Sequence, residues 1–213
     1  MDAALLDAPE GKTEYHTITL TGSTALTFIL KVVGPSSAVD PSKPSAPEGL
    51  TNASTDNAPY YFVWQKAEGI KRIGVLRADV DNLGQTFVAG FAGKYATLSR
   101  TAALSRQLSI FFKYYIRSIL KNGEYHIDGE KKLTERNATI VYSGGDDVFI
   151  VGAWNEVIEL SIDLQEKFKK YTQGTLSISS GIGIYECTYP IGAIANETGE
   201  MEAESKRCLK KIL

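Results

Sequence analysis

Two apolar runs meet at a four-residue polar turn in the second half of the chain. The runs ATIVYS (138–143) and VFIVG (148–152) flank the sequence GGDD, from Gly144 to Asp147. A short connection of glycine and aspartate between two β-type runs predicts a tight hairpin, because both residues accept the backbone angles of such turns. The sequence therefore predicts two adjacent antiparallel strands around which the rest of the chain has to pack.

A turn alone would account for these four residues, since Gly-Gly and Gly-Asp are common turn dipeptides. Taken by itself, GGDD favours a turn without any chemistry. Two neighbouring carboxylates repel each other, however, unless their surroundings supply positive charge. The rest of the sequence has to decide between a simple turn and a functional site.

Strand and helix patterns alternate on both sides of the hairpin. A strand is expected at 70–78, a glycine-containing loop or short helix at 82–95, a long helix at 98–120, a second helix at 155–172, a strand at 175–185 and a short helical tail at 191–211. With the hairpin, the order is βαββαβ, which is typical of a ferredoxin-like palm. The expected fold class is α+β, with an antiparallel sheet and helices on one face.

The N-terminal part of the chain has a different composition. Residues 14–33 are rich in Thr, Ile, Val and Leu and predict one or two strands, whereas residues 34–59 are dense in Pro, Ser, Ala and Asn and predict a loop or linker. The run YYFVW (60–64) predicts another short strand. We therefore expect an N-terminal strand-like segment and linker at 1–59 and a palm domain at 60–213.

The bulk properties exclude several classes of protein. The formal net charge of the 213 residues is −2, so no overall basic field attracts nucleic acid or an anionic membrane. The two cysteines, Cys187 and Cys208, predict neither a disulfide framework nor a zinc site. No apolar run reaches the roughly 18 residues of a membrane span, and the start of the chain lacks the features of a signal peptide. We expect a cytoplasmic protein that does not enter a membrane.

The predicted topology brings two pairs of carboxylates together. A strand–helix–strand crossover makes the strands at 70–78 and 138–143 parallel, so their C-terminal ends lie at one edge of the sheet. Asp79 and Asp81 follow the first strand, and Asp146 and Asp147 follow the second. Either member of the first pair could instead cap the next segment. The coincidence of both pairs at one edge nevertheless favours a metal site.

Clustered carboxylates suit hard cations such as Mg²⁺ or Mn²⁺. Two such ions about 4 Å apart form the usual clamp for phosphoryl or nucleotidyl transfer. Gly144 and Gly145 fit this interpretation, since glycine lets the backbone approach a nucleotide closely.

Three motifs in order give the chain a recognisable family resemblance. LRADVDNLG (76–84), LSRTAALSRQLSIFFKYY (98–115) and VYSGGDDVFIVG (141–152) resemble the second palm domain of the large subunit of type III-A CRISPR effector complexes, the cyclic oligoadenylate synthase. The resemblance covers about residues 60–205. The pattern is more distantly similar to the GGDEF domains of diguanylate cyclases.

The resemblance implies a palm that binds ATP and two divalent ions, Mg²⁺ or Mn²⁺. It implies partners as well: other subunits of a ribonucleoprotein with guide RNA and target RNA, whose pairing switches the enzyme on. In such enzymes the 3′-hydroxyl of one ATP attacks the α-phosphate of another, pyrophosphate leaves, and the linked adenylates close into rings.

Individual roles follow from the resemblance, residue by residue. It implies that Asp146 and Asp147 are the catalytic carboxylates and bind metal together with Asp79 and the backbone of Val80. It also implies nucleotide contacts from the following residues: Ser143, Gly144, Gly145, Asp81, Asn82 and Lys206. The match of Lys206 to a triphosphate-binding lysine rests on its position alone, and a lysine in SKRCLKK could equally lie on a solvated helix face.

The chain also departs from the family pattern. His16 and His126 form no His-Asp nuclease pair, and no first palm is recognisable in residues 1–60. Since the family holds its two ATP molecules between two palms, we expect this chain to be a fragment with half of a composite site. A first palm on another chain, or a homodimer, could complete it. The alternatives are a catalytically silent structural palm or a diguanylate-cyclase-like enzyme.

Overall fold

The computed structural model of the chain describes residues 13–20, 26–33, 58–91, 93–129 and 132–212. Its strands and helices are, in chain order, β1 (Thr13–Leu20), β2 (Leu26–Val33), α1 (Ala58–Lys66), β3 (Ile73–Val80), α2 (Leu83–Ala89), the 3₁₀ turn η3 (Gly93–Tyr95), α3 (Leu98–Ile110), the π-helical segment η4 (Phe111–Tyr115), α4 (Ile116–Lys121), β4 (Ala138–Ser143), β5 (Asp147–Ala153), α5 (Trp154–Tyr171), β6 (Ile178–Tyr185) and α6 (Ile191–Ile212). Most of the predicted linker, residues 34–57, lies outside the described residues. Within the described residues, no helix has the length and apolar character needed to cross a membrane.

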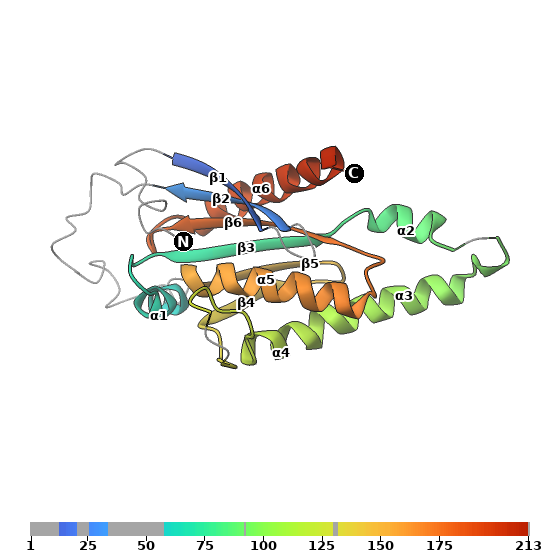
Figure 1. Cartoon of the computed structure of the whole chain (residues 1–213), viewed down its shortest axis with the longest axis horizontal. Coiled ribbons are helices and arrows are strands. Elements are labelled where there is room, and N and C mark those ends of the chain that lie inside the picture. Colours follow the sequence, from blue (N-terminus) through green and yellow to red (C-terminus); the bar gives the residue numbers. More distant parts are fainter. Residues whose placement is uncertain (1–12, 21–25, 34–57, 92, 130–131, 213) are drawn as a thin grey trace.

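The strands form one sheet in the order β1-β2-β6-β3-β5-β4 (Figure 1). The strands β6, β3, β5 and β4 pair antiparallel, and together with the intervening helices they follow the predicted βαββαβ order, which confirms the palm fold. The N-terminal strands extend this sheet, because β2 pairs parallel with β6 and β1 pairs antiparallel with β2. The described part of the N-terminal segment is thus joined to the palm sheet through backbone hydrogen bonds.

Helices cover both faces of the sheet, whereas the sequence predicted helices on one face. Successive side chains of a strand point to opposite faces. Leu76, Ala78 and Val80 of β3 belong to one hydrophobic cluster with residues of α3, η4, α4 and α5. Ile73 and Val75, on the other face, belong to a second cluster with residues of α1 and α6. The additional cover comes from α1, which precedes the palm motif, and from the C-terminal α6.

The run YYFVW is helical, so the prediction of a strand at 60–64 is wrong. It lies within α1, where Val63 is buried against the sheet, and Ala67, four residues on and directly after α1, is buried as well. That spacing is helical, but a short apolar run fits a strand or a buried helix equally well from the sequence. Trp64 shows the close packing here, since its indole nitrogen donates to the carbonyl of Lys71 at 2.7 Å.

The long helix predicted at 98–120 contains a wider turn in its middle. Buried or partly buried residues recur at every fourth position: Leu104, Leu108, Phe112, Ile116 and Leu120. A regular α-helix has 3.6 residues per turn, so a spacing of four would carry this face gradually around the helix axis. The π-helical segment η4 has a longer hydrogen-bonded turn and corrects that drift. Both halves of the helix therefore keep the same face on the sheet.

We predict that Gly181→Ala destabilises the protein. Gly181 lies in β6 under α6, where an added Cβ would come within 2.6 Å of the Glu202 nitrogen and 2.7 Å of the Thr198 carbonyl oxygen. Both obstacles are backbone, so the helix would have to move away, at a cost of about 1–3 kcal/mol. Urea unfolding should show a lower midpoint, whereas the control Gly192→Ala, with no atom within 4 Å of its added Cβ, should show no loss. Equal stabilities of the two variants would contradict this account of the α6–sheet contact.

Candidate functional site

The end of β3 and the β4–β5 hairpin meet at one edge of the sheet, as the sequence predicts. Asp79 is the register partner of Asp147 across the β3–β5 ladder. The next backbone nitrogen, that of Val80, donates to the carbonyl of Asp146 at 3.1 Å. Backbone hydrogen bonds therefore hold the three carboxylate-bearing residues in fixed neighbouring positions, although 67 residues or more separate Asp79 from the other two in sequence.

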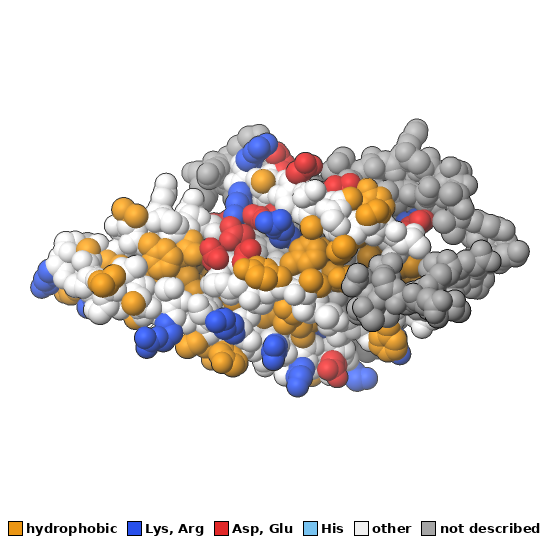
Figure 2. Space-filling model, turned by 180° about the vertical axis from the view of Figure 1, so that it is seen from behind, with side chains coloured by type: hydrophobic (Ala, Val, Ile, Leu, Met, Phe, Trp, Pro, Cys, Tyr) orange, Lys and Arg blue, Asp and Glu red, His pale blue; other side chains and the backbone are white. Residues whose placement is uncertain are grey.

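The cluster faces helix α6. Along one face of β3 the residues change from apolar Ile73 and Val75 to polar Arg77 and Asp79. The apolar pair packs in the core beneath α1 and α6, and the polar pair continues the same face toward the strand end. Figure 2, which views the molecule from behind, shows acidic side chains gathered beside Lys and Arg side chains on this face.

Lys206 of α6 supplies positive charge to the cluster. Its ammonium group pairs with the carboxylate of Asp79 and also with that of Glu202, at 2.8 Å. Glu202 in turn pairs with Arg77 at 3.3 Å. Burial lowers the pKa of Lys206, but its hydrogen bonds to Asp79 and Glu202 outweigh this and raise the pKa above its ordinary value. Lys206 is thus a charged member of the site, whereas the sequence left open a solvated helix face.

Ionisation of Asp146 is disfavoured by its surroundings. Partial burial raises the pKa of its carboxyl, and the negative charges of Asp79 and Asp147 raise it further. The charge of Lys206 acts in the opposite direction but does not cancel these effects. A cation placed between Asp79 and Asp146 would relieve the repulsion.

Tyr142 contacts Asp147 and was missed by the sequence analysis. Its hydroxyl hydrogen-bonds to the Asp147 carboxylate, whose charge is the main cause of a raised pKa for Tyr142. The ladder between β4 and β5 shifts by one residue between Ile140 and Tyr142. Such bulges redirect side chains next to active sites. The bulge depends on hydrogen bonding between strands, so the sequence pattern gave no signal for it.

The two glycines of the turn are not needed for its backbone angles, contrary to the expectation for such a turn. Neither Gly144 nor Gly145 is among the described residues with positive φ, so the turn does not require glycine for its backbone angles. At Gly144 an added Cβ would come within 2.5 Å of both the Asp147 carboxylate and the Tyr142 hydroxyl. At Gly145 it would meet only Ser109, at 3.8 Å. Gly144 therefore makes room for these side chains, and Gly145 leaves open space.

Two of the predicted nucleotide contacts make other hydrogen bonds. The carboxylate of Asp81 accepts hydrogen bonds from Ser177 and Ser179, both at 2.6 Å, and so fastens the end of β3 to the β6 side. Ser143 donates to the carbonyl of Phe112 at 2.6 Å and fastens the hairpin to η4. The geometry gives both residues a positioning role, and their contact with a nucleotide stays a prediction.

Asn82 lies at the mouth of the site in an unusual backbone conformation. It precedes α2 with φ 52° and ψ 26°, in the left-handed region that asparagine tolerates better than most residues. Its carbonyl accepts from the Thr86 nitrogen at 3.0 Å, and its side chain makes no capping hydrogen bond. The exposed amide therefore remains available to a ligand.

Carboxylates of this kind suit Mg²⁺ or Mn²⁺ in the mode used with nucleotides. No group of three or more His, Cys, Asp or Glu side chains among the described residues is arranged so that it could hold a metal ion by itself. Mg²⁺ commonly binds through one or two carboxylates, with waters and substrate phosphates completing its shell. Metal binding by Asp79, Asp146 and the backbone of Val80 stays a prediction, which the charges of Asp79 and Asp147 beside Asp146 favour.

The chain matches the family described as Cas10/Cmr2, second palm domain, over residues 72–211. Among curated relatives, it is 51% identical over 147 residues to the CRISPR system single-strand-specific deoxyribonuclease Cas10/Csm1 (subtype III-A) of Mycobacterium tuberculosis. It is 46% identical over 139 residues to the protein of the same name from Enterococcus italicus. The matches cover 67% and 65% of this chain but only 18% and 17% of the relatives, so the chain spans under a fifth of their length.

Solved structures show the same fold at similar coverage. A Csm1–Csm4 cassette in complex with AMPPNP superposes with a TM-score of 0.61 at 33% identity, covering 68% of this chain and 21% of that chain. A Csm1–Csm4 cassette in complex with cA4 gives a TM-score of 0.60 at 30% identity, with the same two coverages.

We predict that Asp146→Asn raises thermal stability at neutral pH in the absence of divalent ions. Because the folded-state pKa of Asp146 lies above its unfolded-state value, about 3.9, ionisation of this carboxyl costs stability. Wild-type stability should therefore fall as pH rises from the unfolded-state pKa through the folded-state pKa. In thermal melts with EDTA, the variant should exceed the wild type at pH 7, and the gap should shrink toward pH 4. The exposed control Glu200→Gln should show no such gap, and a destabilised Asp146→Asn would contradict the assigned repulsion.

Proposed function

The chain belongs to the Cas10/Cmr2 second palm domain family, and from this premise we propose that it binds ATP with divalent ions and forms half of a composite nucleotidyltransferase site. The complete site joins ATP molecules into cyclic oligoadenylates. One observation carries the proposal: Asp79, Asp146 and Asp147 converge at one sheet edge with Lys206 beside them. A plain turn would need neither the convergence nor the lysine.

The names of the structural neighbours support a nucleotide ligand. They include Csm1–Csm4 cassettes in complex with one ATP, with pppApA and with cA3, at TM-scores of 0.60–0.61 and 30–31% identity. These are a nucleoside triphosphate, a linear dinucleotide and a cyclic trinucleotide. We propose that the palm shared with this chain handles the same adenylates.

In the proposed site, Asp79, Asp146 and the Val80 carbonyl hold the divalent ions, and Asp147 stays oriented by Tyr142. The bound ions would offset negative charge on the triphosphate and lower the pKa of the attacking hydroxyl. Gly145, which has open space around it, would let a nucleotide approach the hairpin backbone. The side-chain amide of Asn82, which makes no capping hydrogen bond, would contact the base or the ribose.

The reaction we propose is adenylyl transfer. The 3′-oxygen of one ATP forms a bond to the α-phosphorus of a second ATP, the bond from that phosphorus to the β-phosphate oxygen breaks, and pyrophosphate leaves. The hydroxyl proton passes to solvent. Repetition lengthens the chain. Attack by its terminal 3′-hydroxyl on its own 5′ α-phosphorus then breaks the bond to the β-phosphate oxygen, releases a last pyrophosphate and closes the ring.

Completion of the site requires a second palm. We propose a first palm domain, in the same protein or on another chain, as the usual partner, with a homodimer as the other arrangement. We propose a cytoplasmic type III CRISPR assembly with guide and target RNA as the setting of this chain. The neighbour named as a Csm1–Csm4 subcomplex in the type III-A CRISPR-Csm interference complex supports such an assembly. A structural palm without catalysis and a GTP-using cyclase remain the competing outcomes of the test.

We predict metal-dependent ATP binding by the isolated chain. Isothermal titration calorimetry should show ATP binding with Mn²⁺ that is lost when EDTA replaces the metal, with weaker binding of GTP. Asp146→Asn/Asp147→Asn should abolish the signal, because it removes ligand charge while keeping side-chain size. Equal binding by wild type and double variant would favour the structural palm, and a preference for GTP would favour the cyclase.

A second prediction concerns Lys206, whose ammonium group pairs with Asp79 and so would repel a metal ion bound to the same carboxylate. Lys206→Met should tighten Mn²⁺ binding without nucleotide, by roughly tenfold if a unit charge contributes about 1.4 kcal/mol there. The same change should weaken binding of ATP with Mn²⁺, since a triphosphate contact is lost. Free Mn²⁺ measured by electron paramagnetic resonance reports the first effect, and calorimetry the second. The neighbouring control Arg207→Met, whose side chain is exposed and pairs with Glu204, should change neither.

A further inference from the structure

The segment between the two acidic motifs carries positive charge only. Between Asp81 and Glu124 the sequence contains six Lys and Arg residues and no Asp or Glu, in a chain whose net charge is −2. The six are Lys94, Arg100, Arg106, Lys113, Arg117 and Lys121. The proposed adenylyl transfer uses none of them.

Three of these cations form one row, which we call the cationic stripe: Lys113, Arg117 and Lys121. All three are exposed, and each follows a buried residue of the four-residue repeat: Phe112, Ile116 and Leu120. They therefore share one side of the helix, with like charges at i and i+4. Such pairs destabilise a helix in isolation, so the arrangement favours binding of an anion.

The stripe differs from surface cations that pair with a carboxylate. Lys167 pairs with Glu124, and Arg207 pairs with Glu204. Among the described residues, no carboxylate forms an ion pair with a member of the stripe. Figure 2 shows Lys and Arg side chains spaced along the edge of the molecule that α3 and α4 form, with hydrophobic side chains between them.

Exposed apolar side chains lie beside the stripe. Tyr114 follows Lys113 and is 69% exposed, and Ile110, three residues before Lys113, is 39% exposed. A positive track with an exposed aromatic ring is typical of surfaces that bind single-stranded nucleic acid, because bases stack on the ring while phosphates meet the cations. An acidic protein segment would use the charges but would gain less from the ring.

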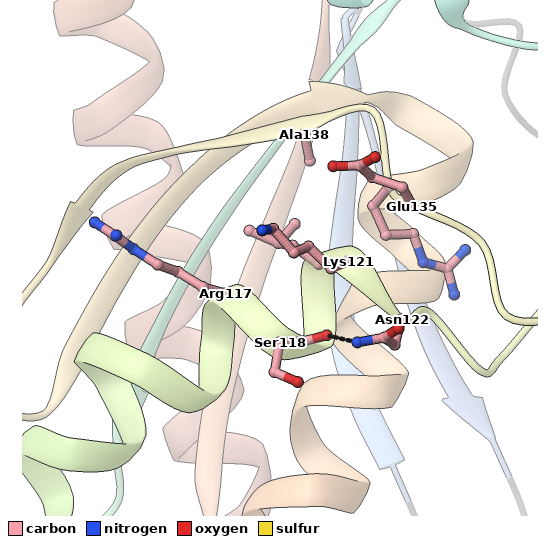
Figure 3. A pocket seen from close by; sticks show the side chains of 8 residues that line it. Arg117, Ser118, Lys121, Asn122, Glu135 and Ala138 are labelled. Carbon is pink, nitrogen blue, oxygen red and sulfur yellow. Dashed lines mark hydrogen bonds between the residues drawn. The ribbon is translucent and has the colours of Figure 1, made fainter.

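The stripe ends at a hollow of about 500 Å³ between α4 and the start of β4. Its lining includes Arg117, Lys121, Asn122 and, on the opposite wall, Glu135 (Figure 3). The volume is within the range of small-ligand sites and is sufficient for one nucleotide. Two cations can meet a phosphate, but an ionised Glu135 can only accept hydrogen bonds. A ribose offers it a 2′-hydroxyl, which deoxyribose lacks.

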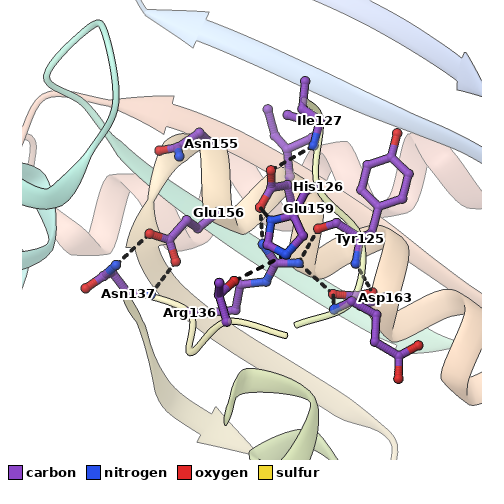
Figure 4. A network of polar contacts seen from close by, with 12 residues as sticks. Tyr125, His126, Ile127, Arg136, Asn137, Asn155, Glu156, Glu159 and Asp163 are labelled. Atoms are coloured by element: carbon purple, nitrogen blue, oxygen red, sulfur yellow. Dashed lines mark hydrogen bonds and ion pairs between the residues drawn. The ribbon is translucent and has the colours of Figure 1, made fainter. Parts of the chain in front are cut away.

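The wall opposite α4 is held by a buried polar network (Figure 4). Arg136, next to Glu135, pairs with Glu159 and with Asp163, the latter at 2.8 Å. Asp163 also accepts hydrogen bonds from the backbone nitrogens of Glu124 and Tyr125, at 3.1 and 2.9 Å. These bonds fix the segment after α4 to α5, so the hollow is formed before any ligand binds.

From this geometry we propose that the cationic stripe and its terminal hollow bind single-stranded RNA. Phosphates contact Lys113, Arg117 and Lys121, a base stacks on Tyr114, and Glu135 accepts a hydrogen bond from a ribose 2′-hydroxyl. The surface shares no residue with the carboxylate cluster, so the proposal does not depend on ATP binding. It assigns a function to a helix that adenylyl transfer uses only as packing.

Fluorescence anisotropy with the whole 213-residue chain tests the proposal, with labelled 20-nucleotide oligouridine and oligodeoxyuridine as probes. EDTA in the buffer keeps divalent ions out. We expect the RNA to bind about fivefold more tightly than the DNA, as one charged hydrogen bond allows. Lys113→Gln/Arg117→Gln/Lys121→Gln should weaken RNA binding at least about tenfold and reduce the slope of log K against log salt by about 2, since each single-strand phosphate contact contributes about 0.7.

Two further variants test the separate parts of the site. Tyr114→Ala should weaken the binding of both oligonucleotides by about fivefold or more, because base stacking on the ring is lost. Glu135→Ala should remove the preference for RNA over DNA. The matched control Lys66→Gln/Lys170→Gln/Arg207→Gln, which removes three exposed charges from α1, α5 and α6, should leave RNA binding within about twofold of wild type. Thermal melts should show the stripe variant at least as stable as wild type, because it loses like-charge contacts.

Three results would overturn the proposal. If the control and the stripe variant weaken RNA binding equally, the effect depends on net charge and not on the stripe. Oligodeoxyuridine binding as tightly as oligouridine would refute the role of Glu135 and the assignment to RNA. Displacement of oligouridine by polyglutamate as effectively as by unlabelled oligouridine, at equal charge concentration, would assign the stripe to an acidic protein.

Discussion

Repulsion between carboxylates at the end of β3 and in the β4–β5 hairpin is the constraint on which the functional half of this structure depends. Backbone ladders bring Asp79, Asp146 and Asp147 together, and Lys206 offsets part of the charge. That lysine is within reach because α6 packs closely on β6, where the lack of a side chain at Gly181 leaves room for its backbone. The position of the last helix and the charge balance of the cluster are therefore parts of one arrangement.

The sequence predicted the palm and its convergent carboxylates because both follow from topology. The order of strands and helices was enough to predict that carboxylates far apart in the sequence share one edge of the sheet. In the structure, Asp79 and Asp147 are register partners at that edge. Predictions that depended on local detail were less successful. The run at 60–64 was assigned to a strand because a five-residue apolar run has no distinctive period. The four-residue spacing between the buried Val63 in α1 and the buried Ala67 directly after it is helical, but burial is seen only in the structure.

Side-chain roles at the site were harder to predict than backbone positions. Ser143 and Asp81 stand in the motifs, yet their hydrogen bonds go to Phe112 and to two serines near the start of β6. Tyr142 reaches Asp147 only because a bulge shifts the β4 register. Glu202, which connects Lys206 to Arg77, lies in a helix whose packing the sequence did not indicate. Most of these partners are distant in sequence, and in each case the contact depends on register or helix rotation.

The π-helical segment η4 has a consequence for how this helix tolerates length changes. Removing one residue from Phe111–Tyr115 would restore a regular α-helix and leave the residues beyond it in place, because the π turn accommodates one residue more than an α-helical turn. Keeping all five residues in a regular α-helix would instead turn everything beyond by about 100° relative to α3. Ile116 and Leu120 would then leave the core, and Arg117 and Lys121 would move from their present side of the molecule. The π turn thus acts as a phase correction, and the helix can lose a residue here without losing its alignment on the sheet.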